Sequence, residues 1–178
     1  SMVTIHDLQP LAMPAHFSRV KRSFHRVVLP FSARRAVRVV TLTQHTRQDL
    51  VDRLDADPER VIVVPSGITM PKPDEVSADD VRRVRERYGL GRRRLFVYPA
   101  ITYPHKNHLM LVDAFRAVAG HDTRAALVLT GGAAQMEDEI LDSVRSGGLE
   151  SRVFRLGRIP REDLDAIYRT AVALTFPS

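Results

Sequence analysis

A lysine stands directly before a predicted helix, in a loop that follows a predicted strand. The loop runs from Tyr98 to Asn107 and contains Lys106. The positive end of a helix dipole lies at its N-terminus, so a cation is unfavourable there unless a bound anion contacts both the cation and the helix N-terminus. The free backbone N–H groups of the first helical turn are ready donors to such an anion. The pattern predicts a phosphate site at Lys106. The alternative is a lysine that points into solvent.

Two other loops follow predicted strands and contain small residues. Gly131 and Gly132 come after the strand at 125–130, and Ser66 and Gly67 come after the strand at 61–64. Ligands of open parallel sheets bind outside the carboxyl ends of the strands, and glycine lets the backbone approach a ligand closely. We therefore expect these four residues to contact a bound ligand. The signal is weak, because any tight turn uses the same residue types.

A histidine and an aspartate end the first predicted strand. His6 and Asp7 are candidates to orient a substrate hydroxyl or to move a proton. The alternative is a histidine with a purely structural role. The remaining histidines lack the spacing of a zinc-binding helix, and the chain has no cysteine. We therefore expect neither a metal site nor a cofactor.

The positive charge of the chain is concentrated in one segment. No Asp or Glu occurs between Asp7 and Asp49, and the cations of this window alternate with apolar residues. The cations are Arg19, Lys21, Arg22, Arg26, Arg34, Arg35, Arg38 and Arg47. This basic segment, residues 17–47, is either a solvated helix face or a surface for the phosphates of anionic lipids, of a lipid-linked acceptor or of nucleic acid. No nucleic-acid-binding motif accompanies it, so no nucleic acid partner is expected.

Composition and length limit the class of protein. The chain has 178 residues, of which 44% are hydrophobic and 27% charged. These values exclude collagen-like, fully disordered and disulfide-rich proteins. No apolar run approaches the roughly 18 residues needed to cross a bilayer. We expect a cytoplasmic protein, with peripheral membrane contact through the basic segment as an open alternative.

Short β-branched segments alternate with amphipathic segments of helical period. This alternation predicts the α/β class, with a Rossmann-like parallel sheet and flanking helices. The predicted strands are 3–6, 38–42, 61–64, 95–98, 125–130, 152–156 and 172–176. The predicted helices are 18–28, 44–54, 78–88, 108–119, 134–146 and 161–170. Thr43, Ser77 and Asn107 are predicted N-caps, and Gly89, Gly120 and Gly147 are predicted to close helices.

The residues at 65–73 include Pro-Ser-Gly and Pro-Lys-Pro, a composition typical of an irregular connection. We place a domain boundary there, between 1–70 and 71–178. The second part reads as a β-α-β-α-β-α-β unit, whereas the first has too few strands to close a domain alone. Because Ser1 and Met2 resemble a cloning scar fused to a strand, we expect an excised fragment.

Taken in order, these motifs resemble the family 4 retaining glycosyltransferases, whose GT-B architecture has two facing Rossmann-like lobes. The resemblance rests on residues 4–8 (TIHDL), 61–68 (VIVVPSGI), 104–107 (PHKN), 127–132 (LVLTGG), 153–157 (VFRLG) and 176–178 (FPS). Each motif is modest alone, but the ordered set is fairly specific. It covers nearly the whole chain.

The resemblance implies transfer of a sugar from a nucleotide diphosphate sugar to an acceptor hydroxyl, with retention of anomeric configuration. It implies that Lys106 contacts the diphosphate and that His6 and Asp7 act on the acceptor side. The acceptor would be lipid-linked or a saccharide. Residues 1–70 would form the C-terminal part of the acceptor lobe, and residues 71–178 an incomplete nucleotide-sugar-binding lobe.

Three positions depart from the family pattern. Pro99 and Ala100 stand where most relatives have Gly-Arg, and Ser66 replaces the Asn of Pro-Asn-Gly. The chain also ends at Ser178, before the glutamate-containing donor motif, so we expect the fragment to be inactive. Two other functions remain open. One is a non-catalytic basic module that binds anionic membrane or nucleic acid, and the other is a GT-B phosphorylase or epimerase, because a fold does not settle a function.

Overall fold

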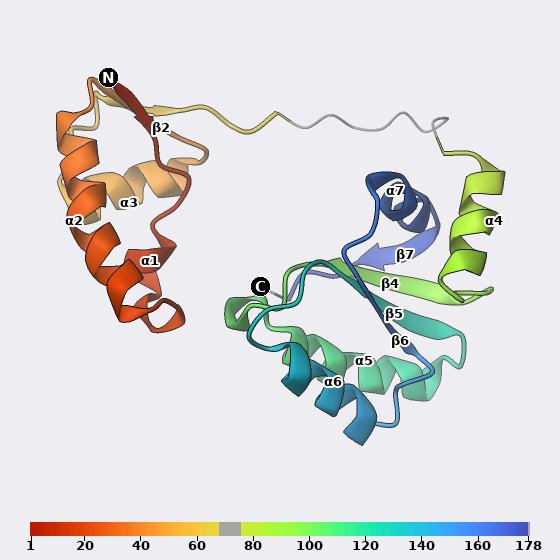
Figure 1. The fold of residues 1–178 in the computed structure, drawn as a ribbon. Helices are drawn as coiled ribbons and strands as arrows, with labels where there is room; N and C mark the ends of the chain where they lie inside the picture. The colour runs from red at the N-terminus through yellow and green to blue at the C-terminus, as the bar shows by residue number, and fades with distance from the viewer. Residues whose placement is uncertain (68–75, 178) are drawn as a thin grey trace. The chain divides into compact units, whose positions relative to one another are not determined.

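The computed structural model describes residues 1–67 and 76–177 (Figure 1). The chain divides into two compact units, Ser1–Thr69 (unit 1) and Met70–Ser178 (unit 2). The connection expected at 65–73 lies partly outside the described residues. Each unit has its own parallel sheet and core, as the alternation of strands and helices predicted.

Unit 1 contains a three-stranded parallel sheet in the order β1-β2-β3. The strands are β1 (Met2–Thr4), β2 (Arg38–Thr41) and β3 (Val61–Val63). The helices are α1 (Gln9–Ala12), the 3-10 helix η1 (Pro14–His16), α2 (Arg19–Arg35) and α3 (Gln44–Leu54). The core of the unit includes Val39, Leu50 and Ala33, which are buried. One strand, one face of α2 and one face of α3 therefore share this core.

Helix α2 differs from its predicted extent. It begins next to Ser18, whose side chain accepts a hydrogen bond from the Lys21 amide, but it continues to Arg35 instead of ending at residue 28. Pro30 lies inside the helix, and the loss of one backbone hydrogen bond there does not end it. Burial of Ala33 against the core holds the C-terminal part in helical form. In α3 the predicted cap is confirmed, because Thr43 Oγ1 accepts from the Thr46 amide at 3.1 Å.

Unit 2 contains a four-stranded parallel sheet in the order β6-β5-β4-β7. The strands are β4 (Arg94–Pro99), β5 (Ala125–Thr130), β6 (Val153–Gly157) and β7 (Ala171–Leu174). The helices are α4 (Ala78–Arg87), the 3-10 helix η3 (Pro104–Lys106), α5 (His108–His121), α6 (Glu137–Ser146) and α7 (Arg161–Thr170). Helices α5 and α6 cover one face of the sheet, and α4 and α7 cover the other (Figure 1).

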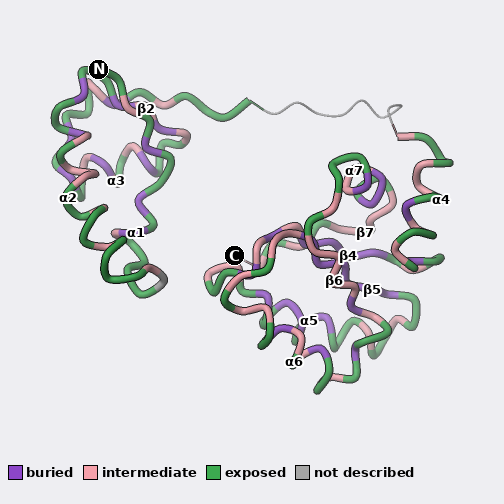
Figure 2. Tube along the Cα trace, viewed as in Figure 1, coloured by how far each residue is buried: buried purple, intermediate pink, exposed green. Residues whose placement is uncertain are grey.

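The central strand β5 is buried at every position (Figure 2). Leu127 and Leu129 belong to the core under α5 and α6, whereas Ala126 and Val128 belong to the core under α4 and α7. Such a continuous apolar strand is expected where helices cover both faces of a parallel sheet. The strand prediction at 125–130 and the α/β class are therefore confirmed.

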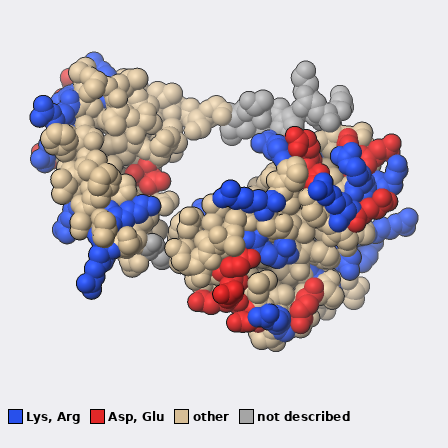
Figure 3. Space-filling view, viewed as in Figure 1, with Lys and Arg blue, Asp and Glu red and all other residues tan. Residues whose placement is uncertain are grey.

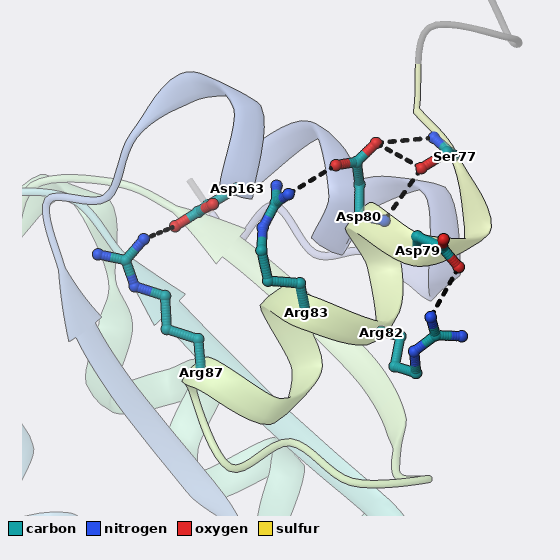
Figure 4. A network of polar contacts seen from close by, with 7 residues as sticks. All are labelled: Ser77, Asp79, Asp80, Arg82, Arg83, Arg87 and Asp163. Atoms are coloured by element: carbon teal, nitrogen blue, oxygen red, sulfur yellow. Dashed lines mark hydrogen bonds and ion pairs between the residues drawn. The ribbon is translucent and has the colours of Figure 1, made fainter.

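The charges of the two units differ on the face shown in Figure 3. On the visible face of unit 1 most of the charged side chains are blue Lys and Arg, whereas blue and red side chains are mixed on unit 2. In unit 2 much of this mixing is local pairing along helices. Figure 4 shows it for α4, where Arg82 pairs with Asp79 and Arg83 with Asp80. The basic segment of unit 1 lacks such acidic neighbours in the sequence.

The cap at the start of α4 is confirmed. Ser77 Oγ accepts from the Asp80 amide at 3.1 Å, and the Asp80 carboxylate accepts from the Ser77 amide, which forms a capping box (Figure 4). The C-terminal end of α4 is joined to α7 through the buried Asp163. Its carboxylate accepts from Tyr88 Oη at 2.7 Å and from Arg87 at 3.2 Å.

Of the three glycines expected to close helices in left-handed conformations, Gly89 and Gly147 lie at helix ends and Gly120 does not. Gly89 has the expected left-handed backbone, with φ of 64°. Gly120, however, lies within α5, which continues to His121. Gly147 has a right-handed backbone, and the next residue, Gly148, takes the positive φ of 63°. With two adjacent glycines, the sequence alone does not determine which one adopts the left-handed conformation.

Candidate functional site

The loop after β4 places Lys106 at the carboxyl end of the unit 2 sheet. The Lys106 carbonyl accepts a hydrogen bond from Tyr98 Oη at 2.9 Å, and its amide donates to the Tyr103 carbonyl at 3.0 Å. Lys106 is half-buried. Among the residues that the structure describes, its Nζ has no hydrogen bond or ion pair. The backbone of this lysine is therefore fixed, while its ammonium group is free to meet a ligand.

Asn107 occupies the N-cap position of α5, but its side chain does not cap the helix. Its φ of 53° puts it in the left-handed region, whereas a capping side chain normally extends from β-region backbone. The side-chain amide points elsewhere and donates toward Met110 Sδ at 3.3 Å. The predicted cap is therefore wrong.

This failure of the cap has a consequence for binding. The first hydrogen bond at the start of α5 runs from the Leu111 amide to the Asn107 carbonyl. In the described part of the chain, the amides of His108, Leu109 and Met110 have no acceptor. Three N–H groups and the positive end of a helix dipole thus lie beside Lys106.

The Gly131–Gly132 turn lies beside the Lys106 loop. Gly131 has φ of 113°, and a Cβ atom there would lie 2.5 Å from the Ala100 carbonyl oxygen. The Gly132 carbonyl accepts from the Thr102 amide at 3.2 Å. Glycine at 131 is thus required by the close approach of two protein loops. Contact of Gly131 and Gly132 with a nucleotide stays a prediction.

A polar network that the sequence reasoning missed holds these loops together. Thr102 is buried, and its hydroxyl donates to Glu137 Oε2 at 2.9 Å and accepts from the Ala134 amide at 2.7 Å. Arg155 donates two hydrogen bonds to the same carboxylate, from Nε to Oε1 at 2.9 Å and from Nη2 to Oε2 at 3.0 Å. The sequence does contain an indication that Arg155 has an acidic partner, because it is the one charged residue inside the apolar strand Val153–Gly157.

The charges of this network neutralise each other. Burial favours the protonated form of Glu137, but the hydrogen bonds from Arg155 and Thr102 outweigh it and lower the pKa of this carboxyl. Arg155 is only 11% exposed and is committed to Glu137. It therefore does not supply a free cation in place of the arginine that family members carry near Ala100.

His108, the first residue of α5, lies under the site. It is 2% exposed, and its ring centroid is 4.8 Å from that of Tyr98. Among the described residues, neither ring nitrogen has a hydrogen bond of ordinary geometry. Burial lowers the pKa of His108, and the nearby Ala100 carbonyl opposes this only in part. The ring is therefore neutral near pH 7, which leaves Lys106 as the cation at this helix start.

The predicted acceptor-side pair lies in unit 1, in the loop after β1. Both His6 and Asp7 are exposed. Asp7 Oδ1 accepts from the Gln9 amide at 3.1 Å, so this carboxylate also shapes the turn that leads into α1. The His6 carbonyl accepts from Thr46 Oγ1 at 3.5 Å. The two side chains line an open groove of about 320 Å³, and their chemical role stays a prediction.

Ser66 and Gly67 follow β3 and are exposed. Gly67 has an ordinary backbone conformation with open space around its Cα, so no contact within the described chain requires glycine there. The structure thus places Lys106, Gly131 and Gly132 together in unit 2, and His6, Asp7, Ser66 and Gly67 in unit 1. Contact of the five residues Lys106, Gly131, Gly132, Ser66 and Gly67 with a nucleotide diphosphate sugar stays a prediction.

Neither a metal cluster nor a membrane span occurs in the described part of the chain. No group of three or more His, Cys, Asp or Glu side chains is placed to hold a metal ion there. No helix among the same residues has the length and apolar character needed to cross a bilayer.

Comparison with known proteins gives consistent matches. Residues 92–178 match the family described as glycosyl transferases group 1. The chain is 30% identical over 155 residues to D-inositol 3-phosphate glycosyltransferase of Salinispora arenicola, with 80% of this chain and 35% of the relative covered. It is 21% identical over 176 residues to the O-antigen chain mannosyltransferase RfbU of Salmonella typhimurium, with 99% and 45% covered. The chain thus spans less than half the length of these curated relatives.

Solved structures show the same fold. The Anabaena protein HepE in complex with UDP and glucose superposes with a TM-score of 0.80 at 21% identity, covering 99% of this chain and 46% of HepE. WaaG, a glycosyltransferase involved in lipopolysaccharide biosynthesis, gives a TM-score of 0.72 at 18% identity, with 99% and 50% covered. The expected GT-B type of α/β fold is thereby confirmed.

Proposed function

Because residues 92–178 belong to the group 1 glycosyltransferases, we propose that the chain is part of an enzyme that transfers a sugar from a nucleotide diphosphate sugar to an acceptor hydroxyl. In this reaction the bond between the anomeric carbon and the diphosphate breaks, and a bond to the acceptor oxygen forms with retention of configuration. The hydroxyl proton passes from the acceptor to the departing diphosphate or to solvent. Negative charge develops on the departing diphosphate, so stabilisation of that charge is the main task of the donor site.

The observation that carries the proposal is the start of α5. Lys106, whose Nζ has no partner in the described chain, and the three amides without acceptors lie within five consecutive residues at the carboxyl end of the sheet, where ligands of such sheets bind. A diphosphate would accept from both kinds of donor. HepE was solved with UDP and glucose bound, which favours a nucleotide sugar for this chain as well.

The remaining site residues would contact the nucleotide or the acceptor in the same transfer reaction. Gly131 and Gly132, with Ser66 and Gly67, would present backbone to the nucleotide. His6 and Asp7 would position the acceptor hydroxyl, and the acceptor would be a saccharide or a lipid-linked molecule. The Thr102–Glu137–Arg155 network would keep the Lys106 loop in place, because it ties the loop to the start of α6 and to β6.

The test is calorimetric titration of the 178-residue chain with UDP-glucose and with UDP. Lys106→Ala should weaken binding of both ligands by about 1–3 kcal/mol, the range for a charged hydrogen bond. Arg124→Ala is the matched control, because it removes a cation at the opposite end of β5. Equal affinity of the native chain and Lys106→Ala would remove Lys106 from the donor site. The chain alone is expected to show no sugar transfer.

A second role is favoured by the exposed face of α2. Val20, Phe24, Val27 and Phe31 recur at the spacing of one helical stripe and are 58–81% exposed. Lys21, Arg34 and Arg35 flank this stripe. An apolar stripe with cations along its margins fits the interface of an anionic membrane. We therefore propose a cytoplasmic enzyme that contacts the membrane peripherally through the basic segment.

Vesicle sedimentation tests the membrane role. The chain should bind vesicles that contain phosphatidylglycerol and should not bind vesicles of phosphatidylcholine alone. Phe24→Ser with Phe31→Ser should abolish this binding. Phe176→Ser, which removes an aromatic residue of 67% exposure in unit 2, should leave it unchanged. Equal binding to both vesicle types, or no effect of the double substitution, would contradict the membrane role.

A further inference from the structure

Unit 1 contains a cavity of about 740 Å³ that the donor site does not use. It lies between α1, α2 and α3. Pro10, Leu11 and Leu54 contribute an apolar wall, and four arginines line the rest together with a few small residues. Its volume is within the range of cavities that bind small molecules. The neighbouring groove at His6 and Asp7 is less than half as large.

The arginines reach the cavity from two helices. Arg19, Arg22 and Arg26 recur on one face of α2, and Arg53 comes from the last turn of α3. At 3.6 residues per turn, this face is centred about 140° around the helix from the apolar stripe described above, so the two faces are distinct. A membrane contact through Phe24 and Phe31 would therefore leave the cavity arginines in place.

Three of the four guanidinium groups are unneutralised. In the described part of the chain, the side chains of Arg19, Arg22 and Arg26 have no hydrogen bond or ion pair, whereas Arg53 pairs with Asp49 at 2.9 Å. None of the residues that line the cavity is Asp or Glu among those described. Like charges gathered at one concave surface repel one another, and a bound anion relieves that repulsion.

The donor chemistry narrows the choice of anion. A guanidinium group is planar and can donate two parallel hydrogen bonds to two oxygens of a phosphate, and several arginines line this cavity. The apolar wall beside them fits a carbon skeleton attached to the phosphate. A free inorganic anion would use the arginines but would make no use of the apolar surface that Pro10, Leu11 and Leu54 contribute to the cavity.

We propose that this cavity binds a phosphate or diphosphate group carried on an apolar molecule. Every residue that lines the cavity belongs to unit 1, whereas Lys106 belongs to unit 2. The inference therefore goes beyond the proposed transferase function and does not depend on nucleotide binding.

The test is calorimetric titration of the chain carrying Lys106→Ala, so that the donor site does not take up the probe. The probes are farnesyl diphosphate, inorganic pyrophosphate and farnesol, all below the concentration at which the lipid forms micelles. Farnesyl diphosphate should bind most tightly, pyrophosphate more weakly, and farnesol not measurably. Arg22→Gln with Arg26→Gln should weaken farnesyl diphosphate binding at least about tenfold, since it removes two charged hydrogen bonds.

The matched control is Arg92→Gln with Arg124→Gln, which removes the same charge from unit 2, outside the cavity. This control should change the affinity by less than about twofold after allowance for salt screening. Circular dichroism verifies that both double variants are folded. Equal losses in the two variants, equal binding of farnesol and farnesyl diphosphate, or no binding of either phosphate probe would overturn the proposal. If pyrophosphate binds as tightly as farnesyl diphosphate, the assignment of the apolar wall is wrong.

Failure of the cavity proposal can be distinguished from failure of the transferase proposal. Substitution of Lys106 in unit 2 should reduce UDP-glucose binding, whereas substitution of Arg22 and Arg26 in unit 1 should reduce farnesyl diphosphate binding. A chain that fails to bind UDP-glucose but shows the arginine-dependent affinity would refute the donor site and support the cavity.

Discussion

Gly131→Ala is expected to destabilise unit 2 strongly, because the position combines two obstacles to a side chain. Its φ of 113° is rare for residues with a Cβ atom, and that atom would lie 2.5 Å from the Ala100 carbonyl oxygen and 2.6 Å from its carbon. A strained backbone of this kind costs about 1–3 kcal/mol. The contact adds to this, since both partners are backbone atoms that hydrogen bonds fix in place. We expect a total loss of about 2–4 kcal/mol in the free energy of unfolding.

Gly132→Ala is the matched control one residue further along. Its Cβ atom would meet Arg158 Nε at 3.1 Å, but Arg158 is an exposed and flexible side chain that can move aside. The backbone of Gly132 lies outside the positive-φ region. The expected change is below about 1 kcal/mol, and reduced freedom of the unfolded chain offsets part of it.

Urea denaturation followed by tyrosine fluorescence measures both variants. The chain has four tyrosines and no tryptophan, and Tyr88, Tyr98, Tyr103 and Tyr168 all belong to unit 2. The signal therefore reports unit 2 alone. At a slope of about 2 kcal/mol per molar urea, Gly131→Ala should lower the midpoint by roughly 1–2 M. Equal midpoints for Gly131→Ala and Gly132→Ala would refute the argument that the approach to Ala100 requires glycine.

The remaining predictions concern the polar network and the buried histidine. Glu137→Gln should lower the unfolding free energy of unit 2 by about 2–4 kcal/mol, because it leaves the half-buried Arg155 without its anion; unchanged urea stability would contradict this role. Since the pKa of Glu137 is lowered in the folded chain, its contribution is present at neutral pH and is lost as the pH falls below the usual glutamate range. That part of the acid dependence should be absent in Glu137→Gln. The folded pKa of His108 is also lowered, so unfolding takes up a proton and stability should fall as the pH drops below about 6.5. His108→Phe keeps a ring beside Tyr98 and should reduce this slope in denaturation curves at several pH values; an unchanged slope would exclude His108 as its source.

The sequence predicted the order of the elements well, because hydrophobic periodicity reports which faces are buried. Strand 125–130 and helices 44–54 and 161–170 agree with the structure in both bounds. Helix α2 was misjudged because Pro30 normally ends a helix, whereas tertiary burial of Ala33 sustains it.

The site was predicted less completely. Lys106 was found because a cation before a helix is a local signal. The Thr102–Glu137–Arg155 network was missed because its members are 18–35 residues apart and meet only through the sheet order. The sequence also did not reveal that Asn107 leaves its helix uncapped, since a left-handed backbone at an asparagine depends on the loop around it.

Among the described residues, strand β7 forms one border of the unit 2 sheet and pairs with β4 alone. Its outer side offers backbone donors and acceptors, and Val172 and Leu174 are about half exposed beside them. Such a border is a template for another extended chain. Concentrated solutions of this polypeptide should therefore self-associate along β7, with light scattering that rises with concentration. A lysine in place of Val172 should suppress the scattering.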